Sequence, residues 1–425
     1  MKVQLYTQIQ PRVANIGIKP KTFAGNQNYS GREIGTLAPY NPYSTNFSQI
    51  SFSALLKTNY IKEIYEQPEV IQKLVDKYFS TSGKVSNLEL GLSKKDINKM
   101  TGIRIVASGS SKNVAEMARD FIEEVTGIPV DIQFASEFAH KKTVANKNDL
   151  MMFISQSGET ADTFAALTKA NPLNLKSIAL TNTPGSKIHE NATTAVEVGA
   201  GKELAVAATK SVTAQLINLY AIGLKLAEIK GTISQGQINS WARGLKSIPQ
   251  NLEKMLKDDK PIKKIAKNLV GENIYYILGR GPNYGSTMEG ALKLRETTYS
   301  NPVSSASGEF LHGYIASVDE TTPVIQIVQG GNSDENYNLA YNNIKEIINK
   351  RSPQKVIIIK NQANKAIEEE PVFKNCQFID IPSIDEKFSP VYVVSRFQML
   401  ANELTKIQGK NPDKPRSLTK AVLSE

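Results

Sequence analysis

The sequence predicts an α/β protein that carries two copies of one parallel-sheet domain, each an α-β-α sandwich. Short apolar runs alternate with amphipathic stretches along most of the 425 residues. Such alternation is typical of a parallel sheet with helices on both faces. The same pattern then occurs a second time at a nearly constant distance along the chain, which indicates an internal repeat.

The elements of the first copy follow from hydrophobic periodicity. A helix is expected at Tyr60–Phe79, with Pro68 near its start. A helix at Val114–Gly127 should end at its glycine, because glycine readily adopts the left-handed conformation of a helix end. Apolar runs predict strands at Ile103–Ser108, Val130–Phe134, Leu150–Ser155 and Ser177–Asn182, and further helices are expected at Ala161–Ala170 and Thr209–Ile229.

The second copy matches the first at several landmarks. Ile103 corresponds to Ile274, 171 positions later, and Ser136 corresponds to Gly308, 172 positions later. The run MMFIS before QSGET recurs as VIQIV, and SIALTN recurs as KVIIIKN. We therefore expect an irregular, flexible N-terminal extension at 1–52, a first domain at 53–245, a second domain at 246–405 and a C-terminal tail at 406–425.

The composition narrows the class of protein. The net charge is +10, but the basic residues are spread out without interleaved aromatic residues, so we expect no nucleic-acid partner. No run approaches the ~18 apolar residues of a membrane-spanning helix, and the N-terminus lacks the apolar core of a secretory signal. Cys376 is the only cysteine and there are three histidines. We therefore expect no disulfide, metal or cofactor, no membrane association and a cytoplasmic location.

A stretch of small hydrogen-bonding residues, Ser155 to Thr160 (SQSGET), follows the third predicted strand. Where a strand leads into a helix, free backbone N–H groups and the positive helix end point to one place. Gly158 allows close approach of the backbone. Four or five hydrogen bonds of about 1.5–3 kcal/mol each suffice to bind a phosphate monoester. No Gly-Lys-Ser/Thr follows, so a nucleotide triphosphate is disfavoured.

The alternative for this stretch is an ordinary helix cap made by Ser157 or Thr160. A second polar stretch, Ser108 to Ser111 (SGSS), favours the anion site because it follows the first strand and lies at the same carboxyl edge. The second copy has QGGNSD in place of SQSGET, with fewer hydroxyls and an acid. The anion site is therefore predicted in the first half only.

Six motifs occur in one order along the chain: SGSS, SQSGETADT, AVAATKSVTAQL, ALKLRETTY, GEFLHG and KPRSLTKAVLSE. In this order they resemble the isomerase half of glutamine–fructose-6-phosphate aminotransferase (glucosamine-6-phosphate synthase), a tandem of flavodoxin-like sugar isomerase (SIS) domains. The resemblance runs from about Tyr60 to Glu425. It implies an isomerase that acts on a hexose or hexosamine 6-phosphate.

The resemblance also implies which residues form the site. The family's phosphate-binding pattern falls on Ser111, Ser155, Gln156, Ser157 and Thr160. The sugar would be lined by Ser110, Val206, Ala208 and Glu289. The catalytic residues would be Glu296, His312, Lys420 and Lys293. The family usually has a serine where Ala208 stands, so one contact to a sugar hydroxyl is expected to be lost or replaced.

The implied roles fit the chemistry of the residue types. Glu296 matches the glutamate that moves a proton between C1 and C2, as a tuned carboxylate can. His312 matches a histidine that assists ring opening from the neighbouring subunit of a homodimer. Lys420 matches a lysine that engages the sugar carbonyl. Taken singly, these residues have ordinary explanations: an exposed ion pair, a structural histidine and a chain end. Their joint occurrence favours a functional site.

The chain departs from the family at its start. There, a glutaminase domain with an N-terminal cysteine precedes the isomerase, whereas here Lys2 follows Met1. We expect a free-standing isomerase that interconverts fructose 6-phosphate and glucosamine 6-phosphate, using free ammonia or ammonia from a separate glutaminase subunit, or running as a deaminase. Two alternatives stay open: a sugar-phosphate sensor without turnover, and a plain hexose-6-phosphate aldose–ketose isomerase.

Overall fold

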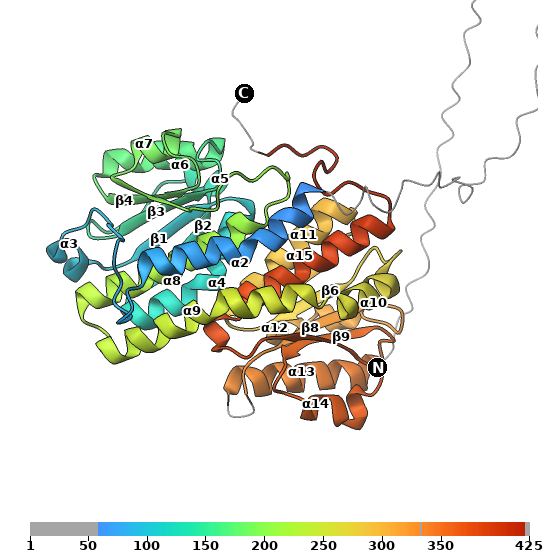
Figure 1. Ribbon diagram of the computed structural model, residues 1–425. Helices are drawn as coiled ribbons and strands as arrows, with labels where there is room; N and C mark the ends of the chain where they lie inside the picture. The colour runs from blue at the N-terminus through green and yellow to red at the C-terminus, as the bar shows by residue number, and fades with distance from the viewer. Residues whose placement is uncertain (1–57, 332–333, 421–425) are drawn as a thin grey trace, which may run out of the picture. The chain divides into compact units, whose positions relative to one another are not determined.

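Two parallel five-stranded sheets form the framework of the computed structural model, which describes residues 58–331 and 334–420 (Figure 1). The first sheet has the order β2-β1-β3-β4-β5. Its strands are β1 (Ile103–Ala107), β2 (Val130–Phe134), β3 (Leu150–Ser155), β4 (Lys176–Thr181) and β5 (Thr194–Glu197). All of its strand pairs are parallel, so the predicted fold class is confirmed.

The second sheet repeats this topology. Its order is β10-β9-β8-β6-β7, which corresponds strand for strand to the first sheet. Its strands are β6 (Tyr276–Gly279), β7 (Val303–Ala306), β8 (Val324–Val328), β9 (Val356–Asn361) and β10 (Gln377–Ile381). The internal repeat is thereby confirmed. Strands β5, β7 and β10, which were not predicted, lie at sheet edges and are only partly buried, whereas the fourth edge strand, β2, was predicted.

The helices of the first half agree with most of the predicted ranges. They are α2 (Asn59–Tyr78), α3 (Lys94–Lys99), α4 (Gly109–Thr126), α5 (Ala135–His140), α6 (Ala161–Ala170), α7 (Lys187–Asn191) and α8 (Lys210–Lys230), with a 3₁₀ turn η1 at Asn171–Leu173. Helix α4 ends as expected, because Gly127 adopts φ 64° at its C-cap. It begins earlier than expected, so that the SGSS stretch forms its first turn.

The expectation for Pro68 was wrong. Pro68 lies inside α2 rather than near its start. A proline in a helix removes the N–H that would bond the carbonyl four residues earlier. Here the carbonyl of Ile64 instead accepts a hydrogen bond from the side-chain Nε2 of Gln67 at 3.0 Å. The helix continues because this buried amide supplies the missing donor.

The second half adds seven helices to the described part of the chain. They are α9 (Gln235–Lys257), α10 (Lys260–Leu269), α11 (Pro282–Thr298), α12 (Ser307–Phe310), α13 (Glu335–Arg351), α14 (Ala366–Glu369) and α15 (Pro390–Ile407), with 3₁₀ turns η2 (Tyr314–Ser317), η3 (Pro371–Phe373) and η4 (Glu386–Phe388). The expected boundary between residues 245 and 246 falls within α9. The expected extension at 1–52 lies outside the described residues.

Four helices between the two sheets carry the main core. Helix α4 packs against α8 and α11, and α11 packs against α15. The largest hydrophobic cluster contains side chains from both sheets and all four helices. Gly285 allows α11 to approach α4 closely, because a Cβ at this position would lie 2.7 Å from the backbone nitrogen of Met117. This contact fixes α11, a helix of the second half, beside the carboxyl edge of the first sheet.

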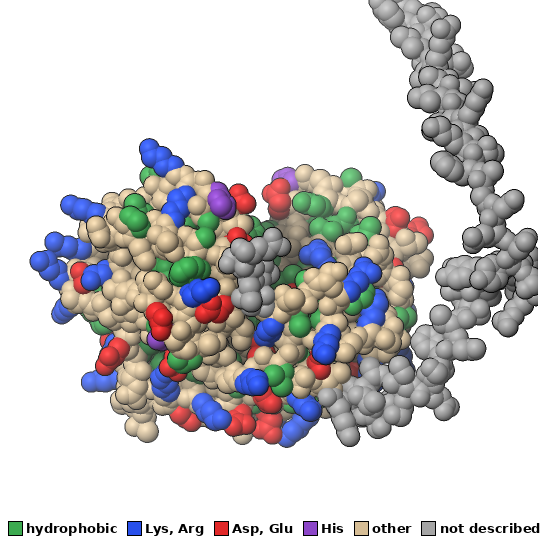
Figure 2. Space-filling model, turned by 90° about the horizontal axis from the view of Figure 1, so that it is seen from above, with side chains coloured by type: hydrophobic (Ala, Val, Ile, Leu, Met, Phe, Trp, Pro, Cys, Tyr) green, Lys and Arg blue, Asp and Glu red, His purple; other side chains and the backbone are tan. Residues whose placement is uncertain are grey.

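The charges on the described surface are mixed. Figure 2 shows Lys and Arg side chains interspersed with Asp and Glu over one face, which is hollowed near its middle. On this face the net charge of +10 therefore forms no single basic stripe. Within residues 58–331 and 334–420, no helix combines the length and apolar character needed to cross a membrane.

Candidate active site

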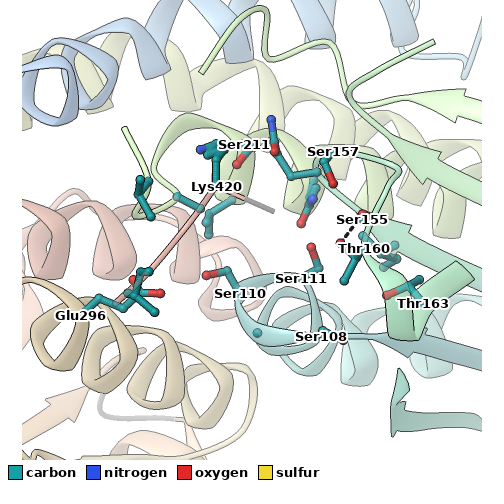
Figure 3. Close-up of a pocket in the computed structure, with 18 of the residues that line it drawn as sticks. Ser108, Ser110, Ser111, Ser155, Ser157, Thr160, Thr163, Ser211, Glu296 and Lys420 are labelled. Atoms are coloured by element: carbon teal, nitrogen blue, oxygen red, sulfur yellow. Dashed lines mark hydrogen bonds between the residues drawn. The ribbon is translucent and has the colours of Figure 1, made fainter. Parts of the chain in front are cut away.

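A cavity of about 270 Å³ lies at the carboxyl edge of the first sheet. Its wall comprises the ends of β1 and β3, the first turns of α4, α6 and α8, the last turns of α11 and the C-terminal tail. The lining residues are Ser108, Gly109, Ser110, Ser111, Ile154, Ser155, Gln156, Ser157, Thr160, Thr163, Val206, Ala208, Ser211, Val212, Gln215, Lys293, Glu296, Leu418, Thr419 and Lys420. In Figure 3, Glu296 lies across the cavity from Ser155 and Thr160.

The SQSGET stretch is a tight loop between β3 and α6. The side-chain oxygens of Ser155 and Thr160 share a hydrogen bond at 2.9 Å, and the N–H of Gly158 donates to the Ser155 oxygen at 3.0 Å. The N–H of Glu159 donates to Ser157 Oγ at 3.1 Å. Thr160 occupies the N-cap position of α6, but its side chain makes no capping hydrogen bond. Simple capping therefore does not account for the hydroxyls of this loop.

Gly158 is required by the geometry of the loop. Its φ is 68°, a conformation that favours glycine. A Cβ at this position would lie 1.9 Å from Ser186 Oγ, so a side chain would push the loop away from the start of α7. The loop is also held there by a hydrogen bond from the N–H of Ile188 to the Gly158 carbonyl at 3.0 Å.

Three helices begin at the cavity. The first turns of α4, α6 and α8 contribute Ser110, Ser111, Thr160 and Ser211 to its wall. The N-terminal end of a helix carries partial positive charge and unpaired N–H groups. The arrangement therefore favours an anion on this side of the cavity without any lysine or arginine in the loop.

A buried charge cluster on α11 lies on the other side. Lys293 Nζ is 2.5 Å from Glu296 Oε2 and 3.5 Å from Glu289 Oε1. Burial would lower the pKa of Lys293, but the two carboxylates outweigh it and raise the pKa, so the ammonium is retained. Burial raises the pKa of Glu289, although Lys293 and a hydrogen bond from Asn113 Nδ2 at 2.9 Å oppose the shift. The Glu296 side chain is 19% exposed and reaches the cavity.

Lys420 is held at the cavity by an acidic side chain that the sequence analysis missed. Lys420 Nζ lies 2.6 Å from Glu203 Oε2 and donates to the carbonyl of Ala205 at 2.6 Å. Glu203 is fully buried. Burial tends to raise the pKa of Glu203, but Lys420 and the backbone N–H groups of Ser211 and Thr209 lower it overall. The carboxylate is therefore ionised at neutral pH.

The structure brings together most of the residues expected at the site. The residues that line the cavity are Ser110, Ser111, Ser155, Gln156, Ser157, Thr160, Val206, Ala208, Lys293, Glu296 and Lys420. Glu289 lies directly behind the wall, in contact with Lys293. His312 is exposed, beyond the end of α12, and is not among the lining residues of this cavity. Within one chain, the structure does not bring His312 to the other residues.

Further lining residues were missed at the sequence level. Ser211 and Gln215 lie one helical turn apart on α8, inside the motif AVAATKSVTAQL, so their spacing offered a signal. Thr163 follows Thr160 by one turn, is buried and leaves its hydroxyl without a hydrogen bond. Glu203, which lines no part of the cavity but contacts Lys420, was also missed and offered no signal, because only the folded chain places it beside a residue 217 positions away.

The corresponding edge of the second sheet has a different character. Its cavity is lined by Gly330, Gly331, Asp334, Glu335, Asn336, Asn361, Ile384, Asp385, Glu386 and Lys387. Carboxylates outnumber the single ammonium group in this lining and would repel a phosphate. The anion site in the first half only stays a prediction. Among the described residues, no three His, Cys, Asp or Glu side chains are grouped as metal ligands.

The fold and the cavity together define a doubly wound α/β protein with a polar, anion-compatible small-molecule site. The family is shown by comparison with known proteins. The SIS domain family model matches residues 97–225 and 269–384, which correspond to the two repeats. The chain belongs to the SIS domain family and contains two such domains in tandem.

Relatives from two organisms show which branch of the family the chain resembles. It is 35% identical over 365 residues to glutamine–fructose-6-phosphate aminotransferase (isomerizing) of Clostridium acetobutylicum, covering 86% of this chain and 59% of the relative. The corresponding protein of Escherichia coli K12 is also 35% identical, over 366 residues. The chain thus spans less than two thirds of these relatives.

The chain spans almost the whole of one solved domain. The C-terminal domain of glucosamine-fructose-6-phosphate aminotransferase from Francisella tularensis superposes with a TM-score of 0.79 at 31% identity, over 84% of this chain and 98% of that domain. A tagatose-6-phosphate ketose/aldose isomerase from Escherichia coli, at 17% identity and a TM-score of 0.70, shares the fold.

Proposed function

We propose that the chain is a sugar-phosphate isomerase that interconverts fructose 6-phosphate and glucosamine 6-phosphate, with ammonia supplied freely or by a partner protein. The observation that carries the proposal is the arrangement of one cavity. Its hydroxyl-rich anion side faces Glu296, and Lys420 lies at the same cavity. The 31% identical C-terminal domain of an aminotransferase whose name contains glucosamine and fructose-6-phosphate supports this choice.

The anion side would hold the 6-phosphate. Ser111, Ser155, Gln156, Ser157 and Thr160 would donate hydrogen bonds, together with the amides at the starts of α4 and α6. The hydroxyls of Ser155 and Thr160 now bond each other and can rotate towards a phosphate oxygen. Binding at this end would leave the sugar directed towards α11 and the tail.

Glu296 would transfer the proton between C1 and C2. A single carboxylate that reaches both carbons can remove and return this proton. Lys293 would hold the Glu296 carboxylate in place and, with Glu289, set its charge environment. Ser110, Val206 and Ala208 would contact the sugar. Glu289 contacts Lys293 from behind the wall, so its effect on the sugar would be exerted through that lysine.

Lys420 would engage the sugar carbonyl. A lysine amine can condense with a keto sugar, releasing water and forming a Schiff base. His312 would assist ring opening in the cavity of a partner subunit, because it does not reach the cavity of its own chain. The proposal therefore includes a homodimer.

The test uses the purified chain. It is incubated with glucosamine 6-phosphate, and separately with fructose 6-phosphate and ammonium, while NMR follows both sugars and an ammonia assay follows the nitrogen. Turnover that disappears in Glu296→Gln would support the proposal and reveal the favoured direction. Interconversion of fructose and glucose 6-phosphates without nitrogen transfer would indicate a plain aldose–ketose isomerase. Ligand-induced thermal stabilisation without C1/C2 proton exchange would indicate a sensor and overturn the enzymatic proposal.

A further inference from the structure

We infer that Glu203 is a positioning residue that holds Lys420, and with it the C-terminal tail, at the cavity. This inference rests on the proposed function, since it assigns Glu203 a part in presenting the Lys420 amine to the sugar. It concerns a residue that lines no part of the cavity and that would act through Lys420. Its basis is the set of contacts that the Glu203 carboxylate makes.

The Glu203 carboxylate is held rigidly. Its Oε1 accepts hydrogen bonds from the N–H of Thr209 at 2.9 Å and of Ser211 at 3.0 Å. Its Oε2 accepts from Ser211 Oγ at 2.8 Å and from Lys420 Nζ at 2.6 Å. The two N–H groups belong to the start of α8, where partial positive charge stabilises a carboxylate. The carboxylate is therefore fixed before Lys420 reaches it.

The contact is directional as well as electrostatic. Lys420 Nζ bonds both Glu203 Oε2 and the carbonyl of Ala205, so two acceptors fix the position of the ammonium. Its side chain is still 28% exposed, whereas Glu203 is 0% exposed. The buried carboxylate of Glu203 and the partly exposed ammonium of Lys420 therefore form a fixed anchor beside the cavity. Such an anchor limits the freedom of a flexible lysine side chain before reaction.

The rest of the tail is attached independently. The Asp413 carboxylate accepts hydrogen bonds from the N–H groups of Asn59 and Tyr60 at the start of α2, at 2.8 and 2.7 Å. The Asp413 carbonyl accepts from the N–H of Val206 at 3.1 Å. Further along, the N–H of Arg416 donates to Tyr299 Oη at 3.0 Å. Release of Lys420 from Glu203 would therefore loosen the last residues without detaching the tail.

A neighbouring carboxylate provides a matched control. Glu63, on α2, is buried beside the same loop and accepts hydrogen bonds from the N–H of Ala205 at 3.2 Å and from Thr209 Oγ1 at 3.3 Å. No hydrogen bond or ion pair joins Glu63 to Lys420 in the contacts described for these two residues. The variant Glu63→Gln thus disturbs the loop that carries Ala205 while keeping the ion pair between Glu203 and Lys420. Lys293 and Glu296 are the other charged groups that share the cavity with Lys420.

The inference is tested by a double-mutant cycle with Glu203→Gln and Lys420→Met. The first readout is the exchange of the C1/C2 proton of fructose 6-phosphate with D₂O, with kcat and KM determined separately. We expect Glu203→Gln to lower kcat by between about 10-fold and 100-fold with little change in KM, because the amine is misplaced while the phosphate side is intact. In the Lys420→Met background, Glu203→Gln should lower the rate by no more than about 2-fold.

A structural role alone gives a different result. If Glu203 only capped α8, its replacement would reduce the rate by the same factor with or without Lys420, and the inference would be overturned. Glu63→Gln should behave in this additive way. Hydrogen exchange of the segment 414–420, measured by mass spectrometry, provides a second readout that needs no turnover. We expect Glu203→Gln and Lys420→Met to speed exchange there equally, and the double variant to speed it no further.

The two proposals fail separately. No proton exchange by the unaltered chain would overturn the proposed function, whereas the exchange of the tail segment would still decide whether Glu203 anchors Lys420. If Glu203→Gln does not fold, Lys420→Met alone tests the anchor, and unchanged tail protection in that variant would overturn it. Activity in the unaltered chain together with additive effects would overturn only the role of Glu203.

Discussion

Glu296 shows how much a single side chain depends on its neighbours. Alone in the helix that contains ALKLRETTY, it would be an ordinary surface glutamate. In the folded chain it combines an ion pair with Lys293 and a position in the wall of the cavity. Lys293 and Glu296, one turn apart on α11, thus form an ion pair in which the lysine is buried and the glutamate reaches the cavity.

Replacement of Glu296 tests its role in proton transfer. Glu296→Gln keeps the size and shape of the side chain but removes the base. We expect proton exchange between C1 and C2 to fall by about 10²–10⁴-fold, the range for loss of a general base. Calorimetric titration with fructose 6-phosphate should show retained binding, because the phosphate contacts lie across the cavity. Loss of binding together with activity would contradict this separation of roles.

Lys293 should matter for stability as well as for the site. Lys293→Met leaves the carboxylates of Glu289 and Glu296 without their cation in a buried environment. We expect a loss of about 3–5 kcal/mol in the free energy of unfolding at pH 7, measured by urea denaturation. The loss should shrink in acid, where the carboxylates take up protons. Lys73→Met breaks an exposed pair with Glu69 and should change the free energy of unfolding far less.

At the scale of elements, the loop between β3 and α6 is the feature that most directly shapes the cavity. The strand fixes where the loop begins, and the packing of α6 and α7 fixes where it must turn. Its hydroxyls and amides are oriented by hydrogen bonds within the loop. The loop is therefore formed before a ligand arrives, and little ordering remains for binding to accomplish.

Gly158→Ala tests this preformed loop. The added Cβ would meet Ser186 Oγ at 1.9 Å and the backbone would keep a strained positive φ. We expect the stability to fall by more than about 2 kcal/mol, together with at least a tenfold loss of affinity for fructose 6-phosphate. Gly127→Ala is the control, because it has a similar φ of 64° and open space around its Cβ. It should cost about 1–2 kcal/mol without changing affinity.

For the whole molecule, the two repeats differ in charge at corresponding edges. The first edge presents hydroxyls and helix starts, whereas the second presents carboxylates around Glu386. Burial, with a smaller contribution from Asp334 and Asp385, raises the pKa of Glu386 to about 7 against the opposing effect of a hydrogen bond from Asn336. The second edge therefore contains a carboxyl group whose charge changes near neutral pH.

This difference predicts a pH dependence of stability. A raised pKa means that the folded chain favours protonated Glu386, so its contribution is fully present below the usual glutamate pKa of about 4.3 and is lost as the pH rises through about 7. The variant Glu386→Gln should therefore match the unaltered chain near pH 4 and exceed it by about 1–3 kcal/mol at pH 8. Urea denaturation at both pH values measures this. An equal difference at both pH values would contradict it.

The expected action of His312 across subunits makes a prediction for the assembly. Chains carrying His312→Ala and chains carrying Glu296→Gln should each be nearly inactive. When they are mixed and exchanged, half of the dimers would hold one chain of each kind, and one site in each such dimer would be complete. We expect recovery of about a quarter of the unaltered activity. Absence of recovery, with mixed dimers demonstrated by mass spectrometry, would place His312 outside the partner's site.

Local patterns were sufficient to predict the central strands, the repeat and the polar loop after β3. Apolar runs such as Leu150–Ser155 and the small polar residues after them are signals contained within a few consecutive positions. The same holds for the glycine that ends α4. Edge strands such as β5 carry weak sequence signals because they are only partly buried. The position of Pro68 was predicted wrongly because the hydrogen bond from Gln67 that replaces the missing proline N–H depends on a particular side-chain geometry.

The sequence by itself determined the two-domain α/β fold, the polar loop after β3 and the identity of most cavity residues, because these depend on periodicity and on motifs that occur in one order. Only the tertiary structure decided how α11 of the second half packs beside the first sheet and that Glu203 holds Lys420. These facts depend on contacts between residues far apart in the chain, which are set by the packing of whole helices. No pattern of neighbouring residues in the sequence predicts them.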